Sequence, residues 1–418
     1  MTWSPAQSVD DAGGYAPDGP YSFARLALSL VISTLIGAGM WAIIVVMPEA
    51  QRDFGVDRAA ASFPYTLMMC VLAFSTIALG RMTDRFGIFW PLVISGSSLG
   101  LGFLLAGYAP NLAVFSAAHV LIGAGAGTGF GPMMADISHW FVKRRGLAVV
   151  VVASGNYIAG TIWPMLMSLC IPLIGWRATY ACLGVIIAAA VLPIALAMRR
   201  RPPAAALDEA EAATAAARAD VGISPRTLLA LLVVAGFACC VAMSMPQVHL
   251  VAYCGDLGYG VAHGAQMLSL MMALGIISRV GSGFVADVIG GSATLMIGSF
   301  MQGVALLLYL YFNGLTSLFV VSGIFGLFQG GIVPMYAVIC RELLSPRQAG
   351  AAIGLVVSAT IFGMAFGGYI SGVIFDLTSS YRMAFLNGVL WNVVNFVIVA
   401  WLFWRRQRRA PAGELLAV

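Results

Sequence analysis

The chain is dominated by long apolar runs, and these constrain its fold more than any other feature. About 20 apolar residues of α-helix cross the ~30 Å hydrocarbon core of a bilayer. Hydrophobic residues make up 61% of the 418 residues and charged residues only 9%, whereas a soluble domain is about a quarter charged. A membrane β-barrel would show alternating segments of about ten residues, and the sequence has none. We therefore predict an all-α membrane protein.

The apolar runs predict twelve transmembrane helices, at 25–48, 62–80, 90–108, 112–137, 147–171, 178–198, 226–251, 263–286, 292–312, 316–338, 349–374 and 383–404. Most Lys and Arg residues fall in loops on the side of the N-terminus, and few fall on the other side. This asymmetry predicts that both termini are cytoplasmic, in a multi-pass protein of a bacterial cytoplasmic (inner) membrane. Because the cations are spread over short loops, we expect no nucleic-acid partner.

The predicted spans divide into two halves of six. We expect a disordered cytoplasmic tail at 1–24, an N-terminal six-helix lobe at 25–198, a cytoplasmic linker at 199–225, a C-terminal six-helix lobe at 226–404 and a cytoplasmic tail at 405–418. The halves repeat each other, since Gly80-Arg-Met-Thr-Asp84-Arg85-Phe-Gly87 after the second span matches Gly283-Phe-Val-Ala-Asp287-Val-Ile-Gly290 after the eighth. Such a duplication predicts two pseudo-repeat lobes around a central pathway.

Arg279 lies deep inside an apolar run, at 262–286, and no other Lys, Arg, Asp or Glu lies so deep in one. A charge near the bilayer centre costs roughly 2.5–3.5 kcal/mol on insertion scales, so such residues usually face a cavity and bind something. A guanidinium can make paired hydrogen bonds to a carboxylate. The alternative is a structural role, with Arg279 donating to backbone carbonyls across the bundle.

The chain resembles the major facilitator superfamily. The stretch Gly80–Gly87 is similar to the signature loop of that superfamily, which helps to latch the lobes together. The resemblance implies a gating role for Gly80, Asp84, Arg85 and Gly87, with a weaker copy at Asp287.

Within the superfamily, three stretches resemble the branch of monocarboxylate and oxalate/formate carriers: 48–60, 248–258 and 279–287. In that branch the eighth-helix Arg binds the substrate carboxylate, which implies this role for Arg279. The acid that the branch often carries one turn earlier is Gly275 here. The eleventh span also lacks the Lys of oxalate carriers. A single deep cation indicates a substrate with one carboxylate.

Other polar residues in the spans are candidates for substrate or proton contacts. His249 and His119 can accept a hydrogen bond or carry a proton, or can simply pack against polar neighbours. A substrate pocket and interhelical packing are both open for a set of amide and aromatic residues: Trp41, Asn156, Tyr157, Gln329 and Tyr336.

Asp136, near the end of the fourth span, is either a proton relay or the partner of the basic loop at 143–145, which we favour. Glu49, Asp376 and Arg382 lie at the outer helix ends and are expected to make gate or loop contacts. The seven Cys residues show no metal spacing, so we expect no cofactor, metal or structural disulfide.

These observations predict a secondary active transporter of a small monocarboxylate, such as a lactate-like, pyruvate-like or other organic acid. We expect proton symport by rocker-switch alternating access, with the carrier acting as a monomer. The alternatives are an organic anion exchanger and an efflux transporter for a hydrophobic compound on the same fold. An enzyme would need a clustered set of catalytic groups, and the sequence shows none.

Overall fold

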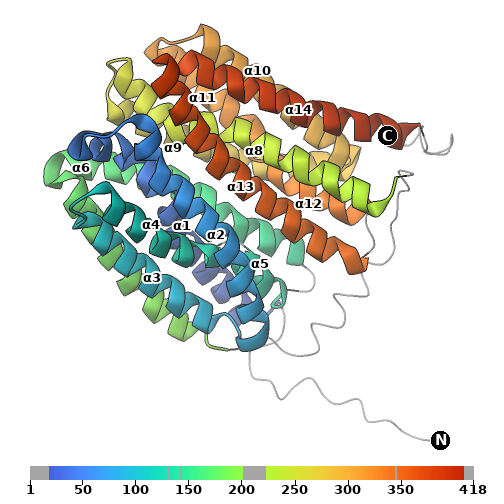
Figure 1. The fold of residues 1–418 in the computed structure, drawn as a ribbon. Coiled ribbons are helices and arrows are strands. Elements are labelled where there is room, and N and C mark those ends of the chain that lie inside the picture. The colour runs from blue at the N-terminus through green and yellow to red at the C-terminus, as the bar shows by residue number, and fades with distance from the viewer. Residues whose placement is uncertain (1–17, 130, 142–143, 201–222, 344–345, 409–418) are drawn as a thin grey trace, which may run out of the picture.

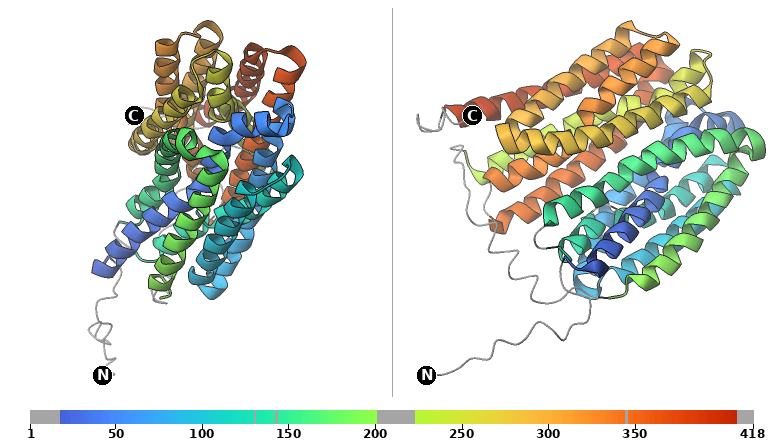
Figure 2. Two further views of the ribbon diagram at one scale, coloured as in Figure 1. Left: turned by 90° about the vertical axis from the view of Figure 1, so that its left-hand side faces the viewer. Right: turned by 180° about the vertical axis from the view of Figure 1, so that it is seen from behind.

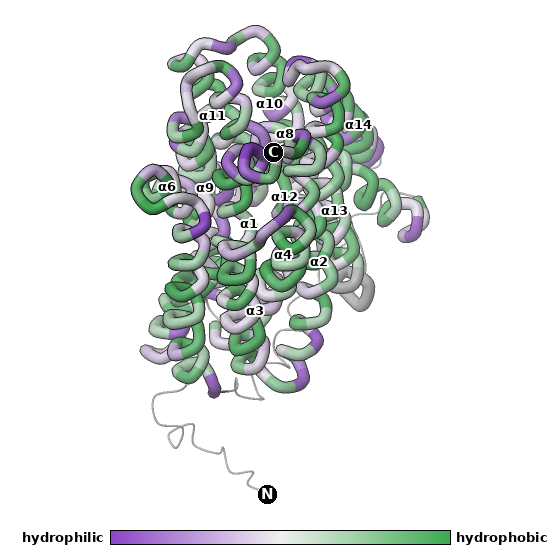
Figure 3. Tube along the Cα trace, turned by 60° about the vertical axis from the view of Figure 1, so that its left-hand side comes forward, coloured by the Kyte–Doolittle hydropathy of each residue, from purple (hydrophilic) through white to green (hydrophobic). Residues whose placement is uncertain are grey.

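The computed structural model describes residues 18–129, 131–141, 144–200, 223–343 and 346–408. Most of the predicted linker at 199–225, and large parts of the predicted tails at 1–24 and 405–418, lie outside the described residues. Within the described residues nearly all of the chain is α-helical, and eleven helices are long and apolar enough to span a membrane. Hydrophobic residues follow the middle of the helices, and hydrophilic residues gather at their ends and in the loops (Figure 3).

The first half of the chain forms one helical bundle and the second half forms another (Figure 1). The N-terminal lobe contains α1 (Pro20–Phe54), α2 (Arg58–Phe86), α3 (Phe89–Gly107), α4 (Leu112–Ala126), the 3₁₀ turn η2 (Gly127–Gly129), α5 (Gly131–Ser138) and α6 (Arg145–Ala197). The C-terminal lobe contains α8 (Pro225–Asp256), α9 (Val261–Ile289), α10 (Gly291–Tyr311), α11 (Leu315–Gln329), α12 (Ile332–Leu343), α13 (Pro346–Thr378) and α14 (Tyr381–Gln407). Helix α1 begins at Pro20, so residues 20–24 of the predicted tail are helical.

Helix α6 holds two of the predicted spans. A straight helix of its 53 residues would be about 80 Å long, far more than one bilayer crossing. The chain turns at Gly175, where φ is 78° and ψ is 158°, in a region that glycine adopts without a steric penalty. The two arms meet at this turn and spread apart from it, both running back into the bundle (Figure 2). Counting them separately gives the twelve predicted spans.

The fourth and tenth spans are each interrupted at corresponding places in the two lobes. The fourth changes from α4 to α5 through Gly127–Gly129, and the tenth changes from α11 to α12 at Gly330 and Gly331. A Cβ on Gly127 would lie 2.4 Å from the hydroxyl of Ser75, and one on Gly330 would lie 2.1 Å from a backbone oxygen of α9. Glycine therefore allows neighbouring helices to touch through their backbones at both interruptions.

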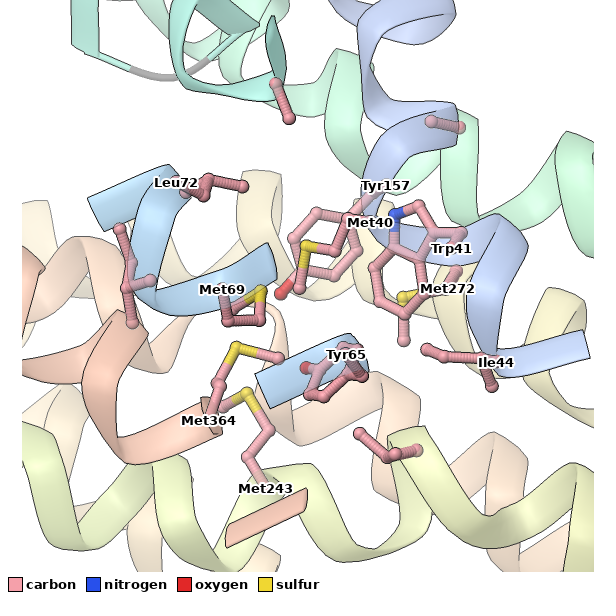
Figure 4. Packing of buried hydrophobic residues seen from close by; sticks show 14 of the residues in the cluster. Met40, Trp41, Ile44, Tyr65, Met69, Leu72, Tyr157, Met243, Met272 and Met364 are labelled. Atoms are coloured by element: carbon pink, nitrogen blue, oxygen red, sulfur yellow. The ribbon is translucent and has the colours of Figure 1, made fainter. Parts of the chain in front are cut away.

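We call the end of the bundle that carries Pro20 and Gln407 the terminal face, and the opposite end, which carries Arg58 and Tyr381, the distal face. Across the lobe boundary, α2 packs against α13 and α6 packs against α9. In the first pair, the hydroxyl of Thr66 donates to the carbonyl of Ala365 at 3.2 Å. Between the lobes, Met, Trp and Tyr side chains of both halves fill the centre (Figure 4).

Candidate functional site

Arg279 lies on α9 at the boundary between the lobes and contacts both of them. Its Nη1 donates to the carbonyl of Ala153 in the N-terminal lobe at 2.8 Å. Its Nε donates to the carbonyl of Gly330, at the interruption of the tenth span, at 3.4 Å. The guanidinium carbon lies 4.5 Å from the ring centroid of Tyr157, in the range of a cation–π contact. Among the described residues, no carboxylate forms an ion pair with Arg279.

Tyr157 can lie beneath the guanidinium because its neighbour on α9 is a glycine. A Cβ on Gly275 would lie 2.5 Å from Cε1 of the Tyr157 ring. The position where related carriers often have an acid is therefore occupied by the face of an aromatic ring. Tyr157 is 6% exposed, so the ring belongs to the interface rather than to the protein surface.

Trp41 and Asn156 lie beside Tyr157 at the lobe boundary. The indole Nε1 of Trp41 donates to the backbone oxygen of Asn156 at 3.0 Å and lies 3.2 Å from its side-chain oxygen. Asn156 also lines a small hollow beside Met40 of α1. Met272 of α9 reaches across the boundary, since a Cβ on Gly160 would touch both Met272 and Trp41. The structure thus brings together four predicted residues: Arg279, Tyr157, Asn156 and Trp41.

Gln329 and Tyr336 lie elsewhere, inside the C-terminal lobe. The amide of Gln329 accepts a hydrogen bond from Gln247 of α8, and both side chains are buried. The hydroxyl of Tyr336 donates to Asn395 at 2.6 Å, which in turn donates to Ser299 at 2.9 Å. These hydrogen bonds link α12, α14 and α10 within one lobe, which is the interhelical packing role that was the alternative to a pocket.

The two histidines have different surroundings. His119 is fully buried among the rings of Phe115 and Tyr180 in the N-terminal lobe, and its Nδ1 lies 2.7 Å from the carbonyl of Phe115. His249 lies on α8 with its Nε2 2.7 Å from the carbonyl of Gly368. A carbonyl can only accept, so Nε2 of His249 carries the hydrogen and Nδ1 holds a lone pair. That Nδ1 is buried without a partner in the described part of the chain.

Asp136 pairs with a residue of α1 and not with Arg144, the part of the favoured basic loop that the structure describes. Lys143 and the side chain of Arg145 lie outside the described residues. Asp136 forms a two-pronged ion pair with Arg25 of α1, with Nε–Oδ2 at 2.9 Å and Nη2–Oδ1 at 2.8 Å. The side chains are 0% and 3% exposed. Arg25 also stacks on the ring of Trp140 at 4.6 Å. Arg25 is the first residue of the predicted span at 25–48, and the sequence does not show that α1 begins earlier, at Pro20, and buries it.

The signature loop and its second copy lie exposed at the terminal face. Asp84 and Asp287 are exposed and form none of the ion pairs found among the described residues. Arg85 lies over the ring of Phe86 at 5.2 Å. A Cβ on Gly80 would meet nothing within 4 Å, and Gly87 ends α2 with φ at 80°. The latch role of these residues stays a prediction.

A cluster of polar residues that is not evident from the sequence joins the lobes at the distal face. Arg58 of α2 donates from Nη1 to the hydroxyl of Tyr381 and from Nη2 to both oxygens of Asp256 at 3.2 Å. Asp376 accepts from the backbone N–H groups of Arg58 at 3.0 Å and Ala59 at 2.6 Å. We call Arg58, Asp256, Asp376 and Tyr381 the distal gate.

Of the predicted outer contacts, Asp376 lies in the distal gate, and Glu49 pairs with Arg52 on the same helix. The backbone N–H of Arg382 donates to the hydroxyl of Ser380 at 3.2 Å. One feature of the sequence could have indicated the distal gate. Asp57 is an N-cap residue type and accepts from the N–H of Ala60, which places Arg58 in the first turn of α2.

Comparison with known proteins identifies the fold. The family model described as Major Facilitator Superfamily matches residues 29–317 and 280–415. Monocarboxylate transporter 13 of Bos taurus is 26% identical over 378 residues, covering 88% of this chain and 86% of the relative. The uncharacterized MFS-type transporter YcxA of Bacillus subtilis is 25% identical over 364 residues, covering 81% and 84%.

Among solved structures, the nucleoside transporter NupG superposes with a TM-score of 0.72 at 15% identity, covering 90% of this chain and all of NupG. The likeness extends to the fold only at that identity. Family model, relatives and structure agree with the two-lobed helical architecture, and all are transporters rather than enzymes. The chain belongs to the major facilitator superfamily and, within it, resembles the monocarboxylate transporter branch.

Proposed function

We propose that this protein is a secondary active transporter of a small organic monocarboxylate, and that Arg279 anchors the carboxylate. The observation that carries the proposal is the position of Arg279 between the lobes, with hydrogen bonds to one backbone carbonyl from each. Both partners are neutral acceptors. A carboxylate makes shorter and roughly twofold stronger hydrogen bonds with a guanidinium than a neutral acceptor does, so a substrate anion can replace them.

The aromatic wall beside Arg279 supports binding of the rest of the substrate. Tyr157 and Trp41 present ring faces with one polar tip each, and Asn156 adds an amide that is partly exposed. Along the eleventh span, residues 352–378 contain neither Lys nor Arg. One guanidinium in an otherwise apolar centre matches a substrate with one carboxylate rather than two.

We propose that the terminal face is cytoplasmic, because most of the loop cations lie there. With the distal gate closed, this structure then corresponds to a carrier shut towards the outside. Rocking of the lobes about the Arg279 level would open the distal gate and expose the site to the other side.

We also propose that a proton accompanies the anion and that His249 carries it. The support is its buried Nδ1, which is free to accept a proton and has no partner among the described residues. The ring also lies 5.7 Å from that of Tyr381, centroid to centroid, which places it directly behind the distal gate. Asp136 is not available for this task while both of its oxygens are held by Arg25.

The test of the anchor is uptake of radiolabelled monocarboxylates by purified protein in proteoliposomes. Arg279→Ala is expected to abolish uptake, and Arg279→Lys is expected to retain a small fraction, because Lys keeps the charge but loses the paired geometry. Both variants should remain monodisperse on size exclusion, since Arg279 is only partly buried. Normal uptake by Arg279→Ala would show that the residue merely ties helices together.

A further inference from the structure

An open cavity of about 780 Å³ lies at the distal face, and Arg279 is not among its lining residues. Its walls come from both lobes: the end of α1 and the start of α2 on one side, and the end of α8 and the start of α9 on the other. Arg58 and Asp256 both line this cavity. We call it the distal vestibule. Its volume is large enough for a small organic molecule.

Arg58 is held in the vestibule wall with part of its hydrogen-bonding capacity unused. The residue is 6% exposed. Its Nη1 is bound to Tyr381 and its Nη2 to Asp256, but its Nε is buried and has no partner in the described part of the chain. A buried donor without an acceptor is destabilising, because it has lost its hydrogen bond to water and gained none in return. The closed gate therefore leaves the guanidinium incompletely satisfied.

A second Arg–Asp pair in the same molecule shows a guanidinium whose Nε and Nη2 both donate to a carboxylate. Arg25 binds Asp136 side-on, with one oxygen on Nε and the other on Nη2, at 2.9 and 2.8 Å, and both side chains are buried. In the distal gate both oxygens of Asp256 instead share the single nitrogen Nη2 at 3.2 Å, and the Asp256 side chain is 40% exposed. The Arg25–Asp136 pair is therefore shielded from solvent, whereas the carboxylate of Asp256 can rotate into solvent.

We propose that Arg58 is a second carboxylate-binding site, at which an organic monocarboxylate displaces Asp256 from the guanidinium and so releases the distal gate. The incoming anion takes the place of Asp256 on Nη2, and once the gate loosens its second oxygen can accept from the Nε that is buried in the closed gate. Because Asp256 belongs to the C-terminal lobe and Arg58 to the N-terminal lobe, the exchange removes an ionic link between the lobes. Asp256 thus acts as a built-in competitor of the anion.

This inference concerns a different residue from the anchor, but it takes its ligand class from the proposed function. In the proposed cycle the vestibule site captures the anion at the distal face before it reaches Arg279. The two sites can be separated by experiment, because occupation of the vestibule can be measured without transport.

The test uses purified protein in nanodiscs carrying Ala262→Cys, a vestibule position, with Cys70, Cys170 and Cys182 replaced by Ala because these are the native thiols that are not buried. The rate of labelling by a bulky maleimide is measured against the concentration of benzoate, with benzamide as the neutral match. Benzoate is expected to slow labelling and benzamide is not. Asp256→Asn should lower the half-protecting concentration by about fivefold, the upper worth of an exposed ion pair.

Two kinds of variant complete the design. Asp53→Asn is the matched control, since Asp53 lies on the same face but contacts Trp176 and Arg177, and it should leave protection unchanged. Arg58→Gln should abolish protection, and Arg58→Lys, which keeps the charge if Gln does not fold, should weaken it. Equal protection by benzamide, or no effect of both Asp256→Asn and Arg58→Lys, would overturn the proposal.

Repeating the measurement with Arg279→Ala separates this site from the anchor. Persistent protection places the anion in the vestibule whatever the outcome for uptake. Loss of protection would mean that benzoate acts from the central site, which would overturn the vestibule proposal and leave the anchor intact.

Discussion

Replacing Asp136 by Asn is expected to cost several times more stability than the same change at Asp256. Removing one partner of a buried, well-formed ion pair costs about 3–5 kcal/mol, because it leaves an uncompensated buried charge. An exposed pair contributes about 0.2–1 kcal/mol. The Arg25–Asp136 pair is 0% and 3% exposed, whereas the Asp256 side chain is 40% exposed. Besides the neutral amide oxygen at position 136, Arg25 would keep its contacts in the described part of the chain with the hydroxyl of Tyr21 at 3.1 Å, the carbonyl of Met198 at 3.3 Å and the ring of Trp140, none of which is charged.

The assay is thermal unfolding of each purified variant in the same detergent, followed by intrinsic tryptophan fluorescence. For soluble domains of 150–250 residues, 1 kcal/mol corresponds to about 2–4 °C in melting temperature. We therefore expect Asp136→Asn to melt at least about 6 °C below the parent, and Asp256→Asn to melt within about 4 °C of it.

An apolar replacement of the whole pair provides the control. Arg25→Met combined with Asp136→Leu removes both charges and should recover much of the lost melting temperature, because no charge is left unpaired. If Asp136→Asn melts with the parent, or if the double variant is less stable than the single one, the reasoning from burial is wrong.

Two further predictions concern the central site and the proton. His249→Gln keeps an amide donor for the carbonyl of Gly368 but removes the basic nitrogen. The substrate should therefore still equilibrate across the membrane, while an inward pH gradient no longer drives its accumulation. Accumulation equal to that of the parent would exclude His249 as the proton carrier. Gly275→Ala places a methyl group 2.5 Å from the Tyr157 ring, which must move away from Arg279, so loss of a contact worth about 1 kcal/mol should raise KM about fivefold. An unchanged KM would show that the ring does not support the guanidinium.

The number of spans and the duplication could be predicted from the sequence because they depend on local properties. An apolar run either is or is not long enough to cross a bilayer, and Gly175 marks the turn that divides α6. Arg279 was recognisable for the same reason, because the free-energy cost of placing its charge in the membrane depends on its depth in one helix.

The ion pairs could not be predicted because they join residues far apart in the chain. Arg25 and Asp136 are separated by 111 positions, and Arg58 and Asp256 by 198. Arg25 and Arg58 lie at the edge or outside of the predicted spans, where cations are usually exposed, although both are almost fully buried. Tyr336 shows the reverse case: a polar residue within a span suggested a pocket, but its hydroxyl meets Asn395 inside one lobe.

The backbone contacts at the interruption of the tenth span also affect how mutational scans of this protein should be interpreted. A Cβ at Gly326, Gly330 or Gly331 would lie 2.1–2.2 Å from atoms of α9. At Gly326 and Gly330 the overlap is with backbone atoms, and at Gly331 it is with the side chain of Ser282. Cysteine or alanine scanning is therefore expected to lose function at Gly326 and Gly330 through steric overlap, whether or not the substrate passes near them. A scan that ranks positions by lost uptake would wrongly assign these glycines to the substrate pathway. Only measurements that report protein abundance beside uptake will distinguish the glycines from Arg279.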